Sequence, residues 1–325
     1  MSKHSATLEK EITDALWTLG REVESSSKGQ WRCHVGENGK APVDVRLDDE
    51  WLTCQFPVAS PSTEDELWRT VERSKSLDGA CKVIVEPHDS TFHIRQDIPV
   101  TEDADFSRVC RRALEAVISA RRRYVKPNGD GEAARQAESV PADDSDNDSK
   151  TGGTDPSADA STLIAALKDA CVEAGWLWSE REGSRPFVDL DIPEGSRRVD
   201  VDAIPGRGCR LSVSLARHKS LPGTCRSAVA VFLLTANAFV RFARAGVEEG
   251  EKGVEAFYEV WIDERPTAAV VGHALASLSV GYRLCEKELQ VLGNETVART
   301  LLEARGSFLK PGGRSPRKKV PARQG

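Results

Sequence analysis

The strongest constraint on this chain is an order of apolar patterns that occurs twice, once on each side of an acidic segment. The intervening sequence is rich in Gly, Ser, Asp, Pro and Ala, and it has no large apolar residue after Val140. Such a segment cannot bury enough apolar surface to offset the entropy lost on ordering. We therefore expect a disordered acidic linker over residues 127–160, between a first domain of residues 1–126 and a second of residues 161–309.

The first half alternates between helical and strand-like apolar spacing. Leu8, Ile12 and Leu16 recur at helical steps, and Val43–Leu47 alternates apolar with charged residues, which is typical of a strand with one buried side. The expected order is a helix over 8–23, strands over 31–35, 43–47 and 51–58, a helix from 62, a hairpin of strands 82–86 and 92–98, and a helix over 103–124.

The second half repeats this order, although few residues are identical between the halves. The expected elements are a helix over 163–172, strands over 187–192, 198–204 and 209–215, a helix over 225–239, a hairpin of strands 240–247 and 254–262, and a helix over 266–292. A further helix over 295–304 has no counterpart. We therefore predict an α+β fold of two tandem α-βββ-α-ββ-α domains, each an antiparallel sheet packed by helices.

Composition narrows the function classes. The chain has 325 residues and a net charge of -6, so two domains are expected, with no general attraction to nucleic acid or anionic lipid. No apolar run approaches the ~20 residues that span a bilayer, and Met1–Lys10 lacks the apolar core of a signal peptide. We expect a soluble protein that binds neither membrane nor nucleic acid.

The eight cysteines are widely and irregularly spaced, and none forms a C-x-x-C pair. Zinc sites and disulfide frameworks need clustered spacing, so these residues are interpreted as buried thiols in a reducing cytoplasm. The end of the chain, residues 310–325, is basic and predicted to be disordered. It is interpreted as a solubilising tail, or alternatively as an electrostatic contact, for example with the protein's own linker.

The order of elements resembles that of the class I type III secretion chaperones and of the YbjN-like proteins. The features that carry the resemblance are Val43–Leu47 as second strand, residues 82–98 as hairpin and the long final helices. The resemblance covers both halves, and it implies a bacterial, non-enzymatic module that holds a peptide or client protein segment without a cofactor. Secretion chaperones pair as homodimers, so two fused copies would form an intramolecular pseudo-dimer; a homodimer of the whole chain is the other arrangement.

The helix over 225–239 bears on that arrangement because its apolar residues leave almost no polar face. A helix that is apolar all round must be covered on more than one side. Either the other half covers it, or its own sheet and final helix do.

Three aromatic residues are candidates for a peptide-binding surface. Phe257 and Trp261 alternate with Val254, Ala256 and Tyr258, which places them on the opposite, charged side of their strand. Trp51 lies opposite its strand's apolar residues in the same way. Aromatic anchors with a polar rim suit a peptide groove, whereas the alternative is packing against the other half or the extra helix.

The alternative function is a metal-dependent hydrolase. Asp189, Asp191, Asp200 and Asp202 alternate on two neighbouring strands, and carboxylates gathered on one face can hold Ca²⁺ or Mg²⁺. Arg185, Arg197 and Arg198 are close enough in sequence to neutralise them, so solvent-facing aspartates on a sheet are the simpler interpretation. The histidines form no metal-binding spacing, and no nucleophile or phosphate-binding motif occurs. The basic cluster Arg121–Arg123 ends a helix and is interpreted as a solvated surface, or alternatively, together with Arg111 and Arg112, as a patch for an acidic client or RNA.

Overall fold

A computed structural model of the chain describes residues 3–19, 22–35, 41–48, 51–77, 81–88, 90–101, 105–125, 159–180, 185–205, 207–262 and 266–305. The predicted basic tail, and the predicted linker apart from its last two residues, lie outside this part of the chain.

The first half forms one antiparallel sheet with three helices. Its elements are α1 (Lys3–Thr18), β1 (Glu22–Ser27), β2 (Gln30–Val35), β3 (Ala41–Asp48), β4 (Trp51–Val58), α2 (Glu64–Ser74), β5 (Lys82–Val85), β6 (Phe92–Pro99) and α3 (Phe106–Val125). The six strands lie in the order β1-β2-β3-β4-β6-β5, and every pairing is antiparallel.

The second half repeats this topology. Its elements are α5 (Ala160–Glu173), β7 (Leu177–Ser179), β8 (Phe187–Ile192), β9 (Gly195–Ile204), β10 (Gly208–His218), α6 (Gly223–Phe239), β11 (Arg244–Gly250), β12 (Gly253–Ile262), α7 (Ala268–Val291) and α8 (Glu295–Ala304). The strand order is β7-β8-β9-β10-β12-β11, which matches the first sheet element by element.

The predicted α+β fold with two antiparallel sheets packed by helices is therefore confirmed, and the structure adds one strand to each half. β1 and β7 both pair with the strand that follows them along the chain. The first helix ends at Thr18 rather than reaching Val23, which lies in β1 instead. β11 begins at Arg244 rather than Val240, because residues 240–243 form a turn after α6.

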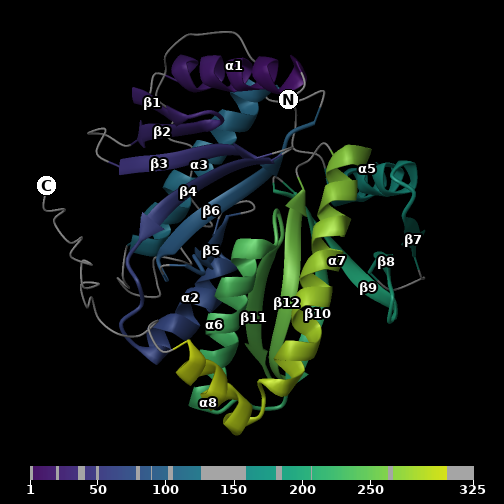
Figure 1. The fold of residues 1–325 in the computed structure, drawn as a ribbon. Helices are drawn as coiled ribbons and strands as arrows, with labels where there is room; N and C mark the ends of the chain where they lie inside the picture. The colour runs from purple at the N-terminus through teal and green to yellow at the C-terminus, as the bar shows by residue number, and fades with distance from the viewer. Residues whose placement is uncertain are drawn as a thin grey trace, which may run out of the picture.

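Each sheet buries one side against its own helices. In the first half, α1 and α3 pack together, and α3 lies on β4 and β6 (Figure 1). In the second half, α7 crosses β10 and β12 and packs against α5. Alternating residues such as Val43, Val45 and Leu52 are almost fully buried on this side, whereas their sequence neighbours form the other side, here called the outer face of the sheet.

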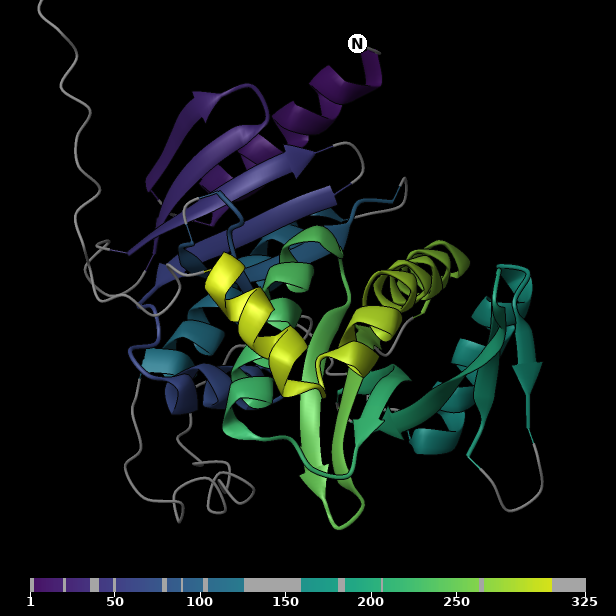
Figure 2. The same cartoon turned by 60° about the horizontal axis from the view of Figure 1, so that its bottom comes forward.

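The halves pack against each other through their middle helices and edge strands. The second-half helix α6 lies on β5, the first-half helix α2 lies on β11, and the two helices also contact each other. α6 is covered further by α8, which Figure 2 shows running alongside it. The apolar α6 is therefore buried by both halves, because each side of the helix meets a different element.

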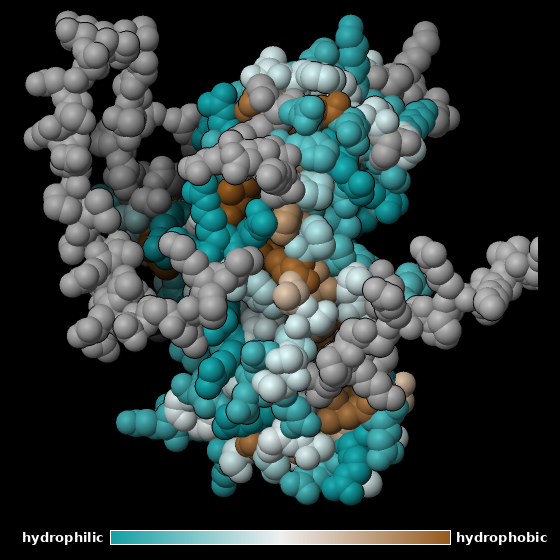
Figure 3. All heavy atoms as spheres, turned by 90° about the vertical axis from the view of Figure 1, so that its left-hand side faces the viewer, coloured by the Kyte–Doolittle hydropathy of each residue, from teal (hydrophilic) through white to brown (hydrophobic). Residues whose placement is uncertain are grey.

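One described helix, α7, is long and apolar enough to cross a membrane by length and composition. Its apolar character is explained by what it buries: Leu275, Leu278 and Cys285 have no exposed surface. Gly281 lets α7 approach the sheet closely, since a Cβ atom there would lie 2.9 Å from the ring of Tyr258. Val280, Leu284 and Val291 of the same helix are exposed, so α7 buries one side against the sheet and leaves apolar residues on the other. Figure 3 shows one face of the molecule, where hydrophobic surface is confined to separate areas between hydrophilic ones.

Candidate functional site: a charged network and a polar hollow on the first sheet

The outer face of the first sheet carries a polar row that crosses five strands. Arg32 on β2 lies beside Asp44 on β3, which lies beside Gln55 on β4. Gln55 in turn pairs with Arg95 on β6, and Arg95 with Lys82 on the edge strand β5. Alternation on each strand places these side chains on the side away from α1 and α3. The row is exposed at Arg32 and buried at Lys82, because the second half covers only its β5 end.

The buried end holds a network of three charged side chains. Asp97 on β6 has no exposed side-chain surface. Its carboxylate forms ion pairs with Lys82 Nζ at 2.7 Å and with Arg95 Nε at 2.8 Å. Thr53 also donates to Asp97, at 3.0 Å. Arg95 and Thr53 donate hydrogen bonds to Oδ1, and Lys82 neutralises Oδ2 as an ion pair, which offsets the cost of burying this carboxylate.

Burial and pairing act in opposite directions on these groups. Burial lowers the pKa of Lys82 to about 8, although the adjacent Asp97 opposes this shift. Burial by itself would raise the pKa of Asp97, but the Lys82 and Arg95 cations outweigh it and hold that pKa well below its usual range. At neutral pH the pair is therefore ionised.

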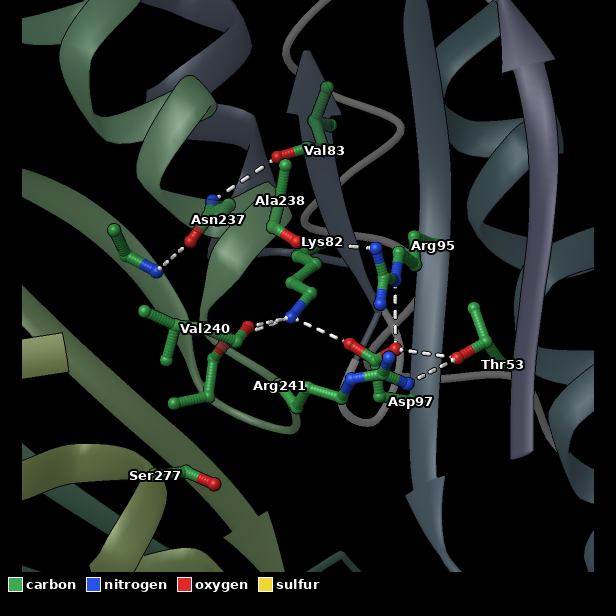
Figure 4. A network of polar contacts seen from close by, with 12 residues as sticks. Thr53, Lys82, Val83, Arg95, Asp97, Asn237, Ala238, Val240, Arg241 and Ser277 are labelled. Atoms are coloured by element: carbon green, nitrogen blue, oxygen red, sulfur yellow. Dashed lines mark hydrogen bonds and ion pairs between the residues drawn. The ribbon is translucent and has the colours of Figure 1, made fainter. Parts of the chain in front are cut away.

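Lys82 also joins the two halves. Its ammonium group donates to the carbonyl oxygens of Val240 and Ala243, which lie in the turn between α6 and β11 (Figure 4). Arg95 reaches the same region by donating to the carbonyl of Ala238 at 3.3 Å. One buried cation thus serves the carboxylate of its own sheet and the backbone of the other half.

Arg244 makes the reciprocal connection from the second half. It is the first residue of β11, as Lys82 is of β5, and it pairs with Glu259 on the neighbouring strand at 2.6 Å. Its guanidinium donates to the carbonyl oxygens of Lys75, Leu77 and Cys81, in the segment between α2 and β5. Both pairs are almost completely buried. The interface is thus approximately two-fold in its contacts, as in a symmetric dimer.

Two further side chains complete the junction. Asn237, buried in α6, donates to the carbonyl of Val83 at 3.1 Å and accepts from the backbone of Ala245 at 2.7 Å (Figure 4). Arg241 reaches the first sheet, where it pairs with Asp48 and donates to Thr53 at 3.2 Å. Asn237 precedes the turn after α6, and Arg241 lies in it. Because both side chains bond to residues of the first half, they hold this turn on the first sheet.

Beside this network the outer face is hollowed. The hollow has a volume of about 370 Å³, and its lining consists of Gln30, Trp31, Arg32, Asp44, Val45, Arg46, Thr53, Gln55, Glu86, Arg95 and Arg241. All of these except Trp31 and Val45 are polar or charged, and those two side chains are buried on the other side of the sheet. Among the described residues of the lining, Arg241 is the one that comes from the second half, so the packing of the halves supplies one wall of the hollow.

The three predicted peptide-binding aromatics are placed differently from one another. Trp51 is half-buried and packs against the second half, with its ring 6.0 Å from that of Phe242 and 5.2 Å from that of His273. Phe257 is buried and covers Gly246 on the adjacent strand. Trp261 is partly exposed, and its ring nitrogen donates to Glu259 at 3.3 Å. Trp51 and Phe257 therefore serve packing, and the structure brings none of the three into the hollow.

The four predicted carboxylates share the outer face of the second sheet, but they do not converge on a common point. Asp202 pairs with Arg185 at 2.9 Å and Arg210 at 2.6 Å. Asp200 pairs with Arg198, and Asp189 accepts from serine hydroxyl groups. Among the described residues, no three histidine, cysteine or acidic side chains are grouped to hold a metal ion. Arginine pairs account for Asp200 and Asp202 and serine hydroxyl groups for Asp189, so no observation on the described residues favours the hydrolase alternative.

The cysteines are all free and buried. Burial raises the pKa of Cys110, Cys171 and Cys285 to about 12, which keeps these thiols protonated and poorly nucleophilic. Cys33 and His34 are neighbours on β2 and point to opposite sides, as strand alternation requires.

The charged network is not predicted from the periodicity of the sequence, although two local signals for it exist. Lys82 precedes the apolar run Val83–Val85, and Asn237 interrupts the apolar sequence of α6. A polar residue within an otherwise apolar element needs a buried partner. The sequence gives no indication of which partner, because Lys82 meets residues more than 150 positions away.

Comparison with known proteins adds little to this geometry. No family model and no curated protein match the chain. Among solved structures, the search returned the crystal structure of DynU16, a protein from the dynemicin biosynthetic locus, with 13% identity over 88% of this chain and 93% of that one. The TM-score is 0.14, so this likeness carries no argument about fold or function.

Proposed function

We propose that the chain is a non-enzymatic cytoplasmic module that binds a segment of another polypeptide, and that the polar hollow on the first sheet is its binding surface. The observation that carries this proposal is the hollow itself. It is open at the Arg32 end and closed by Arg241 at the other. Its volume of about 370 Å³ is that of a site for a small molecule or for a few residues of a peptide, and it is too small for a folded partner.

The chemistry of the lining supports a peptide. Small-molecule sites are lined mainly by apolar side chains, whereas amide, hydroxyl and charged groups line this hollow. The side-chain amide of Gln55 offers a donor and an acceptor that complement a peptide backbone, and the outer arginines offer further donors. The ion pairs of Arg95 and Arg241 hold two walls in place before a client arrives, and such pre-organisation lowers the entropy lost on binding.

The described residues offer no competing catalytic arrangement. The buried cations Lys82 and Arg244 bond to backbone carbonyl groups of the other half, and Asp97 and Glu259 pair with them within their own sheets. The described residues that line the hollow include no cysteine, histidine or serine, and the hydroxyl of Thr53 is engaged by Asp97 and Arg241. The carboxylates of Asp44 and Glu86 are the remaining groups of this lining that could transfer a proton. A role in binding therefore fits the lining better than a role in catalysis.

Site-specific photo-crosslinking tests the proposal. A photoreactive amino acid replaces Gln30, which lines the hollow, and in a matched control it replaces Glu251 in the exposed turn between β11 and β12. Both proteins are irradiated in lysate of the native cell, and cross-linked peptides are sequenced. We expect a recurring client segment at position 30 that is missing at position 251, and a synthetic copy of it should compete. Equal labelling at both positions, or cross-linking that the synthetic segment does not reduce, would contradict the proposal.

A further inference from the structure

We infer that the hollow selects acidic client segments, with Arg32 and Arg46 as the residues that recognise their carboxylates; this inference rests on the proposed function. Four arginines line the hollow, Arg32, Arg46, Arg95 and Arg241, against two acidic residues, Asp44 and Glu86. The whole chain, by contrast, has a net charge of -6. Asp97 and Asp48 pair with the inner arginines Arg95 and Arg241, so the positive charge that attracts a ligand of opposite sign is carried by Arg32 and Arg46.

The arginines also keep donors that no described residue uses. Arg32 donates through Nε to Asp44 at 2.8 Å, and its two terminal nitrogens have no acceptor among the described residues. Arg46 lies 3.8 Å from Asp48, which is too long for a hydrogen bond. Arg95 donates through Nε to Asp97 and through Nη1 to the carbonyl of Ala238, and these two bonds do not use its Nη2. A planar guanidinium with two neighbouring free N–H groups matches a carboxylate in two-point contact.

Exposure separates the recognising residues from the supporting ones. The side chains of Arg32 and Arg46 are 51% and 60% exposed, whereas those of Arg95 and Arg241 are 11% and 28% exposed. The two inner arginines are committed to the junction of the halves. The outer two can therefore meet a ligand without disturbing the buried network.

The acidic residues at the site favour a polypeptide over a nucleic acid. Asp44 lies inside the row of arginines and Glu86 lines the same hollow, so a continuous phosphate backbone would meet two like charges. A peptide can place carboxylates beside Arg32 and Arg46 and an uncharged residue beside Asp44. The buried ring of Trp31 also leaves no stacking platform for a base in the hollow.

The test uses three labelled peptides of about twelve residues, in which Ser alternates with Glu, Gln or Lys. Binding to the full-length protein is followed by fluorescence polarisation at about 50 and about 300 mM NaCl. We expect the Glu peptide to bind at least about tenfold more tightly than the Gln peptide and to weaken with salt. The double variant Arg32→Gln, Arg46→Gln should bind it about tenfold more weakly, whereas Arg32→Lys, Arg46→Lys should lose less, because the charge remains.

Arg217→Gln is the matched control. Arg217 also lies on a strand and also pairs with one carboxylate, that of Glu255, and its side chain is 54% exposed compared with 51% for Arg32. It should leave binding unchanged, and thermal melting should show that all variants stay folded. Equal affinity for the Glu and Gln peptides, unchanged binding by the double Gln variant, or tighter binding of a single-stranded RNA of similar length would overturn the inference.

The two proposals fail in different ways. Recurring cross-links at position 30 to segments without acidic residues would remove the acidic preference and keep the binding module. If no segment is captured at that position and the acidic peptide also fails to bind, both are wrong.

Discussion

Lys82 and Arg244 stand at equivalent positions in the two halves, and each donates hydrogen bonds to backbone carbonyl groups of the other half. Each is the first residue of an edge strand, and each pairs with a carboxylate on the neighbouring strand, Asp97 and Glu259 respectively. Because both cations reach across the junction, the carbonyl groups that accept from them lose these donors when the halves separate, although each cation keeps the carboxylate of its own sheet. This relationship makes the tandem arrangement a single cooperative structure.

The first prediction concerns the loss of the Lys82 charge. Lys82→Met should destabilise the protein by about 3–5 kcal/mol, because it leaves Asp97 with one cation and strands two buried carbonyl groups. Urea unfolding measures this change. The control Lys168→Met removes an exposed ion pair with Glu180 and should change stability by less than about 0.5 kcal/mol. Equal effects of the two changes would mean that the Lys82 network contributes little.

The second prediction concerns acid. The folded state holds the pKa of Asp97 below its unfolded value, so the carboxylate stabilises the protein above the unfolded value, near 4, and this contribution is lost as pH falls toward the folded value. The wild type should therefore exceed Asp97→Asn in stability by about 3–5 kcal/mol at pH 7, and the gap should narrow below about pH 4. Urea titrations between about pH 3 and 7 measure it. A gap that is constant with pH would show that ionised Asp97 is not the source.

The third prediction concerns the two halves as separate chains. Residues 159–305 alone should self-associate or bind a hydrophobic dye, because α6 loses the cover of α2 and β5. Mixing with residues 1–126 should restore a one-to-one complex on size-exclusion chromatography. The same mixture with Arg244→Met should assemble poorly, since three carbonyls of the first half lose their donor. If the second half is monomeric and cooperatively folded by itself, the junction is not essential to its stability.

The fourth prediction uses two glycines of the same helix. Gly281→Ala should destabilise by about 1–3 kcal/mol, because the new methyl group would press on the Tyr258 ring. Gly272→Ala meets nothing within 4 Å and should stabilise by about 0.5–1 kcal/mol through higher helix propensity. Thermal unfolding followed by circular dichroism distinguishes the two. If both substitutions change the stability in the same direction, α7 does not approach the sheet as closely as described.

The sequence by itself determined the order of elements and its duplication. Local patterns predict which side of an element is buried, as the alternation at Val43–Leu47 and the helical spacing at Leu8, Ile12 and Leu16 do. Such periods survive even where residue identity between the halves is low, since burial constrains polarity and not identity. The weakly patterned β1, with the sequence EVESSS, escaped prediction because its pairing with β2 defines it as a strand.

Only the tertiary structure decided how the halves meet and where the site lies. Alternation predicted that Trp51 and Phe257 belong to a peptide-binding surface. In the structure Trp51 packs on Phe242, and Phe257 is buried over Gly246. Alternation shows which side of a strand a residue occupies, but it cannot show what covers that side. The hollow between Arg32 and Arg241 depends on contacts between residues about two hundred positions apart. Packing of the two halves creates those contacts, and no local pattern in the chain records them.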